Sequence, residues 1–424
     1  MATMKVLVLN CGSSSVKFQV IETSLAMIEA DTDHVLARGG VEKIGLSDSR
    51  LTLEVDGRKP FHEISEILEH RAAVERILKI LVHPEHGVLS EVSEIEAVGH
   101  RMVHGGEKFA SSELITPEVE AGIEECVVLA PLHNPHNLRG LRASRALLPN
   151  VPHVAVFDTA YHQSMPARAY IYALPYDLYL RHGIRRYGFH GTSHRYVAIR
   201  TARLLRRPLQ EMKIITCHLG NGCSMTAVDG GRSVDTTMGF TPLEGLVMGT
   251  RCGDLDPAIL PWTMAMEELT LAQLNAMLNK HSGLYGVSGV SSDMREIELA
   301  CERGNRRAQL ALEIFCYRIT KYIGAYAAAM GGVDAITFTG GIGENSAKVR
   351  AMTTAPLAFL GVDLDGERNA TVPRGKEVVV SRDASRVVVA VIPTNEERVI
   401  ARDTVRVLGG VMPSFAAPET AAPR

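Results

Sequence analysis

VLVLNCGSSSVKFQV, residues 6–20, is the stretch that predicts the fold. Residues 6–9 form a short apolar run that is typical of a buried strand. Gly12 and the three serines after it are small residues that can reverse the chain. Residues 16–20 then alternate between apolar and polar side chains, as a half-buried strand does. The turn offers donors for a phosphate, with Lys17 behind it, although similar hairpins occur in proteins that bind no ligand.

A second copy of this pattern lies about half a chain away. Residues 215–228, ITCHLGNGCSMTAV, align with residues 7–20 as a strand, a Gly-rich turn and another strand. Asn10 then falls opposite His218, at the end of the first strand in each copy. Two unrelated hairpins would also explain the likeness. We favour a duplication, because both strands and the turn keep the same register.

Composition excludes several classes of protein. The chain has 424 residues, enough for two or three domains, and a net charge of −3 that suggests no nucleic-acid or anionic-membrane partner. No apolar run reaches the ~18 residues of a membrane span, and the N-terminal apolar run is too short for a signal peptide. Seven cysteines without a C-x-x-C pair suggest reduced thiols in a cytosol rather than disulfides or a zinc site.

Hydrophobic periodicity predicts strands that alternate with helices. We expect further strands at 51–55, 95–99, 154–157, 334–339 and 387–392, and helices at 62–82, 117–129, 137–148, 193–207 and 305–330. We expect Thr192 or Ser193 to cap the fourth of these helices, and Asn395 to cap a closing helix. Residues 239–262 predict a long ordered loop, which is often functional. The pattern indicates an α/β protein with mixed sheets in two similar domains and a cleft between them.

Three Gly-rich segments have the composition of a phosphate site. They are residues 10–17, 218–222 and 340–345, the last of them directly between a strand and a helix. Such turns present backbone N–H groups to an anion. None matches the P-loop or the G-x-G-x-x-G pattern, and the protein-kinase strings H-R-D and D-F-G are absent.

Charged residues near these segments are candidates for binding anions or magnesium. Arg101 is followed by Gly105 and Gly106, and Arg251 has a glycine on each side, so the backbone can come close to a ligand there. His190 precedes a predicted helix. A surface salt bridge is the alternative for each arginine. Asp158 and Glu396 are candidate Mg²⁺ ligands, because Mg²⁺ takes one or two carboxylates. Either carboxylate can instead be a local cap.

Taken together in their order, these strings closely resemble the acetate/propionate kinase family. The strings are LVLNCGSSSVKF, GHRMVHGG, PLHNPHN, VFDTAYH, RRYGFHGTSHRYV, CHLGNGCS, DTTMGFTPLEGLVMGTRCGDLDP, TGGIGENS and PTNEE. The resemblance runs from Met4 to about Leu408. It implies two ribonuclease H-like domains of the actin-like ATPase and sugar-kinase superfamily, facing an active-site cleft. It also implies the reaction ATP + acetate ⇌ ADP + acetyl phosphate with Mg²⁺, or Mn²⁺ in its place.

The resemblance assigns roles to residues by motif. It implies catalysis by Asp158, His190 and Arg251, and metal binding by Asn10 and Glu396. It implies an acyl site of Arg101, Val103, Leu132 and Pro242. The residues implied for ATP are Lys17, His218, Leu219, Gly220, Asn221, Gly222, Asp293, Met294, Arg295, Gly341, Ile342, Gly343, Glu344 and Asn345. The carboxylate of the acceptor is already ionised and nucleophilic at neutral pH, so the reaction requires no strong general base. We therefore expect Asp158 to orient Arg101 or a magnesium-bound water rather than to move a proton.

The expected domains are 1–160 with the helix 397–410 for acyl and phosphate groups, and 161–396 for the nucleotide, with a disordered tail at 411–424. The resemblance also implies a cytoplasmic homodimer. A propionate or butyrate kinase is the nearest alternative, because one methylene in an apolar pocket changes binding by only about 1–3 kcal/mol. A non-catalytic ATPase switch of the same superfamily is the other.

Overall fold

The computed structural model describes residues 2–412, so most of the expected tail at 411–424 lies outside the described residues. Contacts divide this part of the chain into two compact units. Unit 1 comprises residues 2–163 and 395–412, and unit 2 comprises residues 164–394. No helix in the described residues combines the length and the apolar character needed to cross a membrane.

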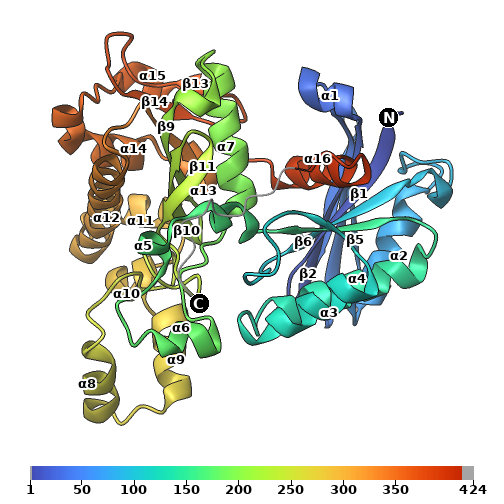
Figure 1. Ribbon diagram of the computed structural model, residues 1–424, viewed down its shortest axis with the longest axis horizontal. Helices are drawn as coiled ribbons and strands as arrows, with labels where there is room; N and C mark the ends of the chain where they lie inside the picture. Colours follow the sequence, from blue (N-terminus) through green and yellow to red (C-terminus); the bar gives the residue numbers. More distant parts are fainter. Residues whose placement is uncertain (1, 413–424) are drawn as a thin grey trace. The chain divides into compact units, whose positions relative to one another are not determined.

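Unit 1 is built on a mixed sheet (Figure 1). The sheet has eight strands in the order β5-β4-β3-β2-β1-β6-β8-β7. The strands are β1 (Met4–Cys11), β2 (Ser15–Thr23), β3 (His34–Glu42), β4 (Leu46–Glu54), β5 (Phe61–Ile67), β6 (Ala97–Met102), β7 (Glu113–Leu114) and β8 (His153–Phe157). The helices are α1 (Leu25–Ala30), α2 (His70–Leu81), α3 (Pro117–Glu125), α4 (Asn134–Leu147) and the C-terminal α16 (Glu396–Leu408).

Strand β1 is buried on both faces, which explains its unbroken apolar run. Leu7 and Leu9 pack into a core with residues of α2 and α4, whereas Val6 and Val8 pack into a second core with residues of α16. Helix α16 returns from the far end of the chain to cover this second face. It approaches so closely that a Cβ on Gly99 of β6 would lie 2.6 Å from the Thr404 hydroxyl oxygen.

Unit 2 is built on a six-stranded sheet with the order β11-β10-β9-β12-β14-β13. Its strands are β9 (Lys213–Leu219), β10 (Cys223–Asp229), β11 (Arg232–Thr236), β12 (Ala335–Thr339), β13 (Val378–Val379) and β14 (Val388–Val391). Its helices are α5 (Ala167–Tyr170), α6 (Asp177–His182), α7 (Gly191–Leu204), α8 (Ile259–Met266), α9 (Leu271–Lys280), α10 (Gly283–Ser288), α11 (Met294–Glu302), α12 (Arg306–Met330), α13 (Gly340–Asn345), α14 (Ala347–Thr354) and α15 (Gly366–Ala370).

The two units repeat one topology. In unit 1, β3, β2 and β1 pair antiparallel, and β6 and β8 then add in parallel. In unit 2, β11, β10 and β9 pair antiparallel, and β12 and β14 then add in parallel. This shared five-strand order is the duplicated ribonuclease H-like fold. The expected duplication therefore extends beyond the hairpin to five strands of each sheet.

The two matching hairpins differ by one residue in their turns. Cys11 pairs with Val16 across four turn residues, whereas Leu219 pairs with Cys223 across three. Burial raises the pKa of the Cys11 and Cys223 thiols to about 12, so both sulfurs are packing groups at neutral pH.

Three local predictions were wrong. The helix expected at 62–82 begins only at His70, because residues 61–67 alternate in burial and form edge strand β5, with Ile64 facing solvent. The segment expected as a turn at 340–345 is itself the short helix α13. The cap of α7 is His190 rather than Thr192 or Ser193, because both of these lie within the helix. As expected, Asn395 caps α16 by accepting the Arg398 N–H.

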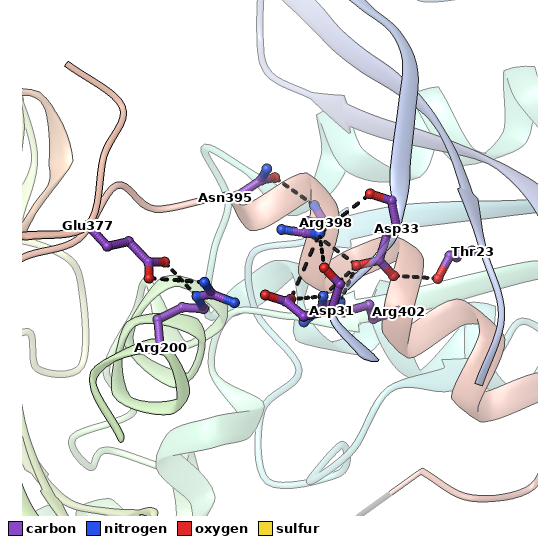
Figure 2. A network of polar contacts seen from close by, with 8 residues as sticks. All are labelled: Thr23, Asp31, Asp33, Arg200, Glu377, Asn395, Arg398 and Arg402. Atoms are coloured by element: carbon purple, nitrogen blue, oxygen red, sulfur yellow. Dashed lines mark hydrogen bonds and ion pairs between the residues drawn. The ribbon is translucent and has the colours of Figure 1, made fainter. Parts of the chain in front are cut away.

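Ion pairs tie α16 to the connection between α1 and β3 (Figure 2). Arg398 donates from Nε to Asp33 at 2.8 Å, and Arg402 binds both Asp33 and Asp31. Burial alone would raise the pKa of Asp33, but Arg402 and the Thr23 hydroxyl lower it below its usual range. Helix α16 is thus attached to unit 1 by ion pairs as well as by the packing of its apolar face.

Candidate active site

Unit 1 gathers three of the predicted site residues around the guanidinium of a fourth, Arg101. Arg101, near the end of β6, donates to the Asp158 carboxylate from Nε at 3.1 Å and from Nη2 at 2.5 Å. Its Nη1 donates to the Asn10 side-chain oxygen at 3.3 Å, and Glu396 lies 3.7 Å from Nε. These residues come from the ends of β1, β6 and β8 and the start of α16. The repeated sheet therefore brings together side chains that lie far apart in sequence.

The cluster is largely buried, and its charges are strongly coupled. Asp158 is 1% exposed. Burial raises the pKa of Glu396 to about 7, with Arg101 acting in the opposite direction and Asp158 adding to the rise. Lys17, on β2, also favours the ionised form of Glu396. Burial opposes the charge of Arg101, but Asp158 and Glu396 more than offset this and raise its pKa.

The oxygen atoms of this cluster suit a hard divalent ion. Mg²⁺ binds one or two carboxylates and takes its remaining ligands from water and phosphate oxygens. Asp158, Glu396 and Asn10 offer that donor set. No cluster of three or more His, Cys, Asp and Glu side chains with metal-binding geometry occurs within residues 2–412.

The predicted acyl-pocket residues are divided between the units. Val103 is 7% exposed, and its N–H donates to Asn137 at 3.0 Å. Leu132 is 71% exposed in the loop before α4. Pro242 belongs to unit 2, where its carbonyl accepts a hydrogen bond from Arg251 at 3.0 Å. An acyl pocket formed by all three stays a prediction.

In unit 2, His190 is held in an unusual backbone conformation next to the second Gly-rich turn. Its φ of 57° is left-handed, which a residue with a side chain adopts at some cost. Its Nδ1 lies 2.9 Å from the Ser224 hydroxyl, and its ring stacks on His218 with 4.3 Å between centroids. Ser224 also contacts His194 at 2.7 Å. Hydrogen bonds from the sheet therefore fix the orientation of the His190 ring.

Arg251 lies beside His190 at the same turn. A Cβ on Gly222 would be 3.5 Å from Arg251 Nη1 and 3.7 Å from His190 Cε1. Arg251 contacts the Pro242 carbonyl and the Met248 sulfur, but within the described residues it forms no ion pair with a carboxylate. Burial lowers its pKa, yet a guanidinium keeps its charge at neutral pH. The turn at 220–222 thus lies beside a positive charge that no carboxylate in the described part of the chain neutralises.

A cavity of about 620 Å³ opens beside this turn. Its lining includes eight of the residues predicted to bind ATP: Gly220, Asn221, Asp293, Met294, Arg295, Gly341, Ile342 and Asn345. These residues come from the turn after β9, the start of α11 and helix α13. A Cβ on Gly341 would meet no atom within 4 Å, which leaves this side of the cavity open.

Six of the residues predicted to bind ATP lie outside this lining: Lys17, His218, Leu219, Gly222, Gly343 and Glu344. Gly343 is buried against β9 and β12, and Glu344 accepts from the Gly340 N–H at 2.9 Å and the Thr394 N–H at 3.3 Å. Burial raises the pKa of Glu344. Both residues belong to α13, but neither lines the cavity.

Several residues of this region were not predicted from the sequence. Ser292, Glu298, Ser346 and Arg374 also line the cavity. Buried Arg350 donates to the carbonyls of Gly343 and Glu344, each at 2.9 Å, and so fixes the end of α13. A Gly-rich segment can be recognised in the sequence. A buried arginine whose hydrogen bonds go to carbonyl and amide oxygens leaves no pattern in the sequence.

The repeated ribonuclease H-like sheets, with a Gly-lined cavity at the turn of one of them, place the protein in the fold class of the actin-like ATPases and sugar kinases. The family model described as the acetokinase family matches residues 5–402, and the chain belongs to this family.

Named relatives agree with this assignment. Acetate kinase of Halothermothrix orenii is 56% identical over 388 residues, covering 92% of this chain and 95% of the relative. Acetate kinase of Alkaliphilus metalliredigens is 55% identical over 380 residues, covering 90% and 94%. The crystal structure of Porphyromonas gingivalis acetate kinase has a TM-score of 0.90 at 51% identity and covers 96% of this chain and 100% of that one. A propionate kinase from Francisella tularensis has a TM-score of 0.86 at 41% identity, covering 95% and 99%.

Proposed function

We propose that this protein is an acetate kinase, which transfers the γ-phosphoryl group of ATP to acetate and forms acetyl phosphate and ADP in a reversible, direct in-line step. Family membership supports the reaction class. The observation that carries the mechanism is the un-neutralised Arg251 guanidinium beside His190 and the 220–222 turn. Phosphoryl transfer needs positive charge around the equatorial oxygens of the moving group, and little covalent help from the protein.

In this proposal the nucleotide occupies the cavity of unit 2. The turn at 218–222 and α13 surround the nucleotide, while Asp293 and Arg295 meet the adenosine. Asp293 and Arg295 already pair with each other at the mouth, so a ligand would find both side chains held in place. His190 and Arg251 stabilise the phosphoryl group as it moves.

The acceptor is proposed to bind through Arg101. A guanidinium binds a carboxylate through two parallel hydrogen bonds, and Asp158 holds Arg101 in orientation from its other side. Val103, Leu132 and Pro242 are proposed to enclose the methyl group. Asn10 and Glu396 would hold Mg²⁺, or Mn²⁺, which when bound supplies charge neutralisation for the phosphates.

The test is the formation of acyl phosphate from ATP, trapped as a hydroxamate, with acetate, propionate or butyrate as acceptor. We expect product only with an acceptor and with Mg²⁺, and the highest kcat/KM with acetate. A higher kcat/KM with propionate would indicate a propionate kinase. ATP hydrolysis without acyl phosphate would indicate an ATPase switch and contradict the proposal.

A cytoplasmic homodimer is also proposed. Helix α8 is rich in large apolar side chains, yet none of its residues is buried. Trp262 and Met266 are 63% and 62% exposed. Such a surface is typical of an interface rather than of a solvated face.

A further inference from the structure

Unit 1 contains a second large cavity that the proposed reaction does not use. It measures about 550 Å³. It is lined by Ser13 of the first hairpin turn, by the start of α2, by one face of α4 and by Ile44. The lining contains neither Arg101 nor Asp158. This cavity is therefore distinct from the Arg101 cluster, although both lie in unit 1.

The cavity carries an excess of positive charge. Arg71 of α2 and Arg139 and Arg142 of α4 line it, with Glu69 as the acidic residue among them. Arg142 is already engaged, since its Nε donates to Glu120 at 2.7 Å. Arg71 and Arg139 form no ion pair with a carboxylate anywhere in residues 2–412. Two exposed guanidinium groups are thus free to bind an anion.

Two histidines lie next to this positive region. His70 and His136 stack with 6.1 Å between ring centroids. Buried Nδ1 of His136 has no hydrogen-bond partner in the described part of the chain. Burial, together with Arg139 and His70, lowers the pKa of His136. The local environment thus disfavours a further proton, as expected where positive charge is not balanced.

The remaining lining is apolar. Leu68 is 63% exposed at the cavity, and Ile44, Ala143 and Ala146 complete its wall. Guanidinium groups next to an apolar wall suit a ligand that has an anionic head and a hydrocarbon part. The planar fork of arginine favours a phosphoryl or carboxyl head, and two such forks favour the dianionic phosphoryl group.

We propose that this cavity binds a small phosphorylated organic molecule, with Arg71 and Arg139 holding the phosphoryl group and Leu68 contacting the apolar part. The occupant would touch the hairpin turn directly through Ser13. It would also reach the turn through His70, whose Nε2–H donates to the Gly12 carbonyl at 2.7 Å. This turn leads directly into β2, which carries Lys17, a predicted ATP ligand. A ligand in the cavity would therefore contact the segment that positions Lys17.

The test is calorimetric titration of the full-length protein with phenyl phosphate and, separately, with inorganic phosphate. The variant is Arg71→Ala/Arg139→Ala. The matched control is Arg303→Ala/Arg306→Ala, which removes two exposed charges from the start of α12 and the residues before it. Neither pair belongs to the proposed catalytic machinery, so any binding at the catalytic site is the same in all three proteins.

We expect the wild type and the control to show a binding component that is at least tenfold weaker in Arg71→Ala/Arg139→Ala. All three proteins should retain the same kcat without added anion, which separates this inference from the proposed function. Tighter binding of phenyl phosphate than of phosphate identifies a phosphorylated organic occupant, whereas equal binding identifies free phosphate. Identical isotherms for all three proteins would overturn the proposal.

Discussion

At the scale of single residues, the partners of a charged side chain determine which role it can have in the site. Arg101 and Arg251 illustrate the contrast. Arg101 is held by Asp158, Asn10 and Glu396, whereas the hydrogen bonds of Arg251 within residues 2–412 go to neutral acceptors. A guanidinium fixed by carboxylates is suited to hold a ground-state ligand in one orientation. One without a counter-charge is suited to stabilise negative charge that develops during reaction.

Replacing Arg251 therefore tests its role in the transition state. We expect Arg251→Ala to lower kcat by about 10²- to 10³-fold, as loss of one preorganised donor does, and to change KM for ATP much less. Arg251→Lys should recover part of the activity, because it restores charge but not the planar fork. Initial rates over a range of ATP concentrations measure both constants. A raised KM at unchanged kcat would contradict the assignment.

A buried histidine pair predicts sensitivity to acid. His100 Nε2 lies 2.9 Å from His153 Nδ1, and His153 Nε2 donates to the Leu148 carbonyl. Burial lowers the pKa of His153 to about 4 and that of His100 well below its usual value. The unfolded chain therefore binds more protons between pH 4 and 6.5, so stability falls as pH falls through this range.

The expected loss is about 1.4 kcal/mol per pH unit for each such histidine. We expect the urea midpoint of the wild type to fall from pH 6.5 to pH 4.5, and His153→Gln to reduce this slope. Exposed His62 provides the control, since His62→Gln should leave the slope unchanged. A slope that His153→Gln does not alter would rule out the pair as its source.

At the scale of elements, the position of α16 depends on the absence of a side chain at residue 99. A Cβ there would lie 2.6 Å from the Thr404 hydroxyl oxygen and 2.7 Å from Ile400 Cγ2. Both neighbours are branched at Cβ and have little rotational freedom, so they cannot move aside easily. The helix that supplies Glu396 to the site is thus seated by a small residue in β6.

Gly99→Ala should destabilise the protein by about 1–3 kcal/mol through overpacking. Gly324→Ala is the matched control. Gly324 lies in α12 with no atom within 4 Å of the added Cβ, and alanine is the better helix former by about 1 kcal/mol. Chemical denaturation should show a loss for the first and no loss for the second. Equal stability of the two variants would contradict the close packing of α16 on β6.

At the scale of the whole molecule, the exposed apolar side chains of α8 predict self-association. If α8 is buried between two copies, a charge at its centre should weaken the dimer. Trp262→Glu is expected to shift the mass measured by sedimentation from about twice the chain mass toward that of one chain. Phe359→Glu, at an exposed apolar residue outside α8, serves as control. A monomeric wild type, or a dimer that Trp262→Glu leaves intact, would refute this assignment.

Much of the fold could be predicted from the sequence, because its cues are local. The run at 6–9, the alternation at 16–20 and the matching stretch at 215–228 predicted both central hairpins. Local cues failed where two periodicities overlap, as in 61–67, whose apolar residues fit helical spacing although the segment is an edge strand. They also failed where glycines form a helix, as in α13, because packing against the sheet overrides propensity.

The sequence by itself determined the duplicated hairpins, the alternation of strands and helices, and the strings that place the chain in its family. Only the tertiary structure decided that Arg101 is bound by Asp158, Asn10 and Glu396. It also decided that Arg251 has no carboxylate partner among residues 2–412, and that two guanidinium groups face an unassigned cavity. The physical reason is that strands and turns follow from neighbouring residues. The charge state and the partners of a side chain depend instead on groups that folding brings from distant parts of the chain.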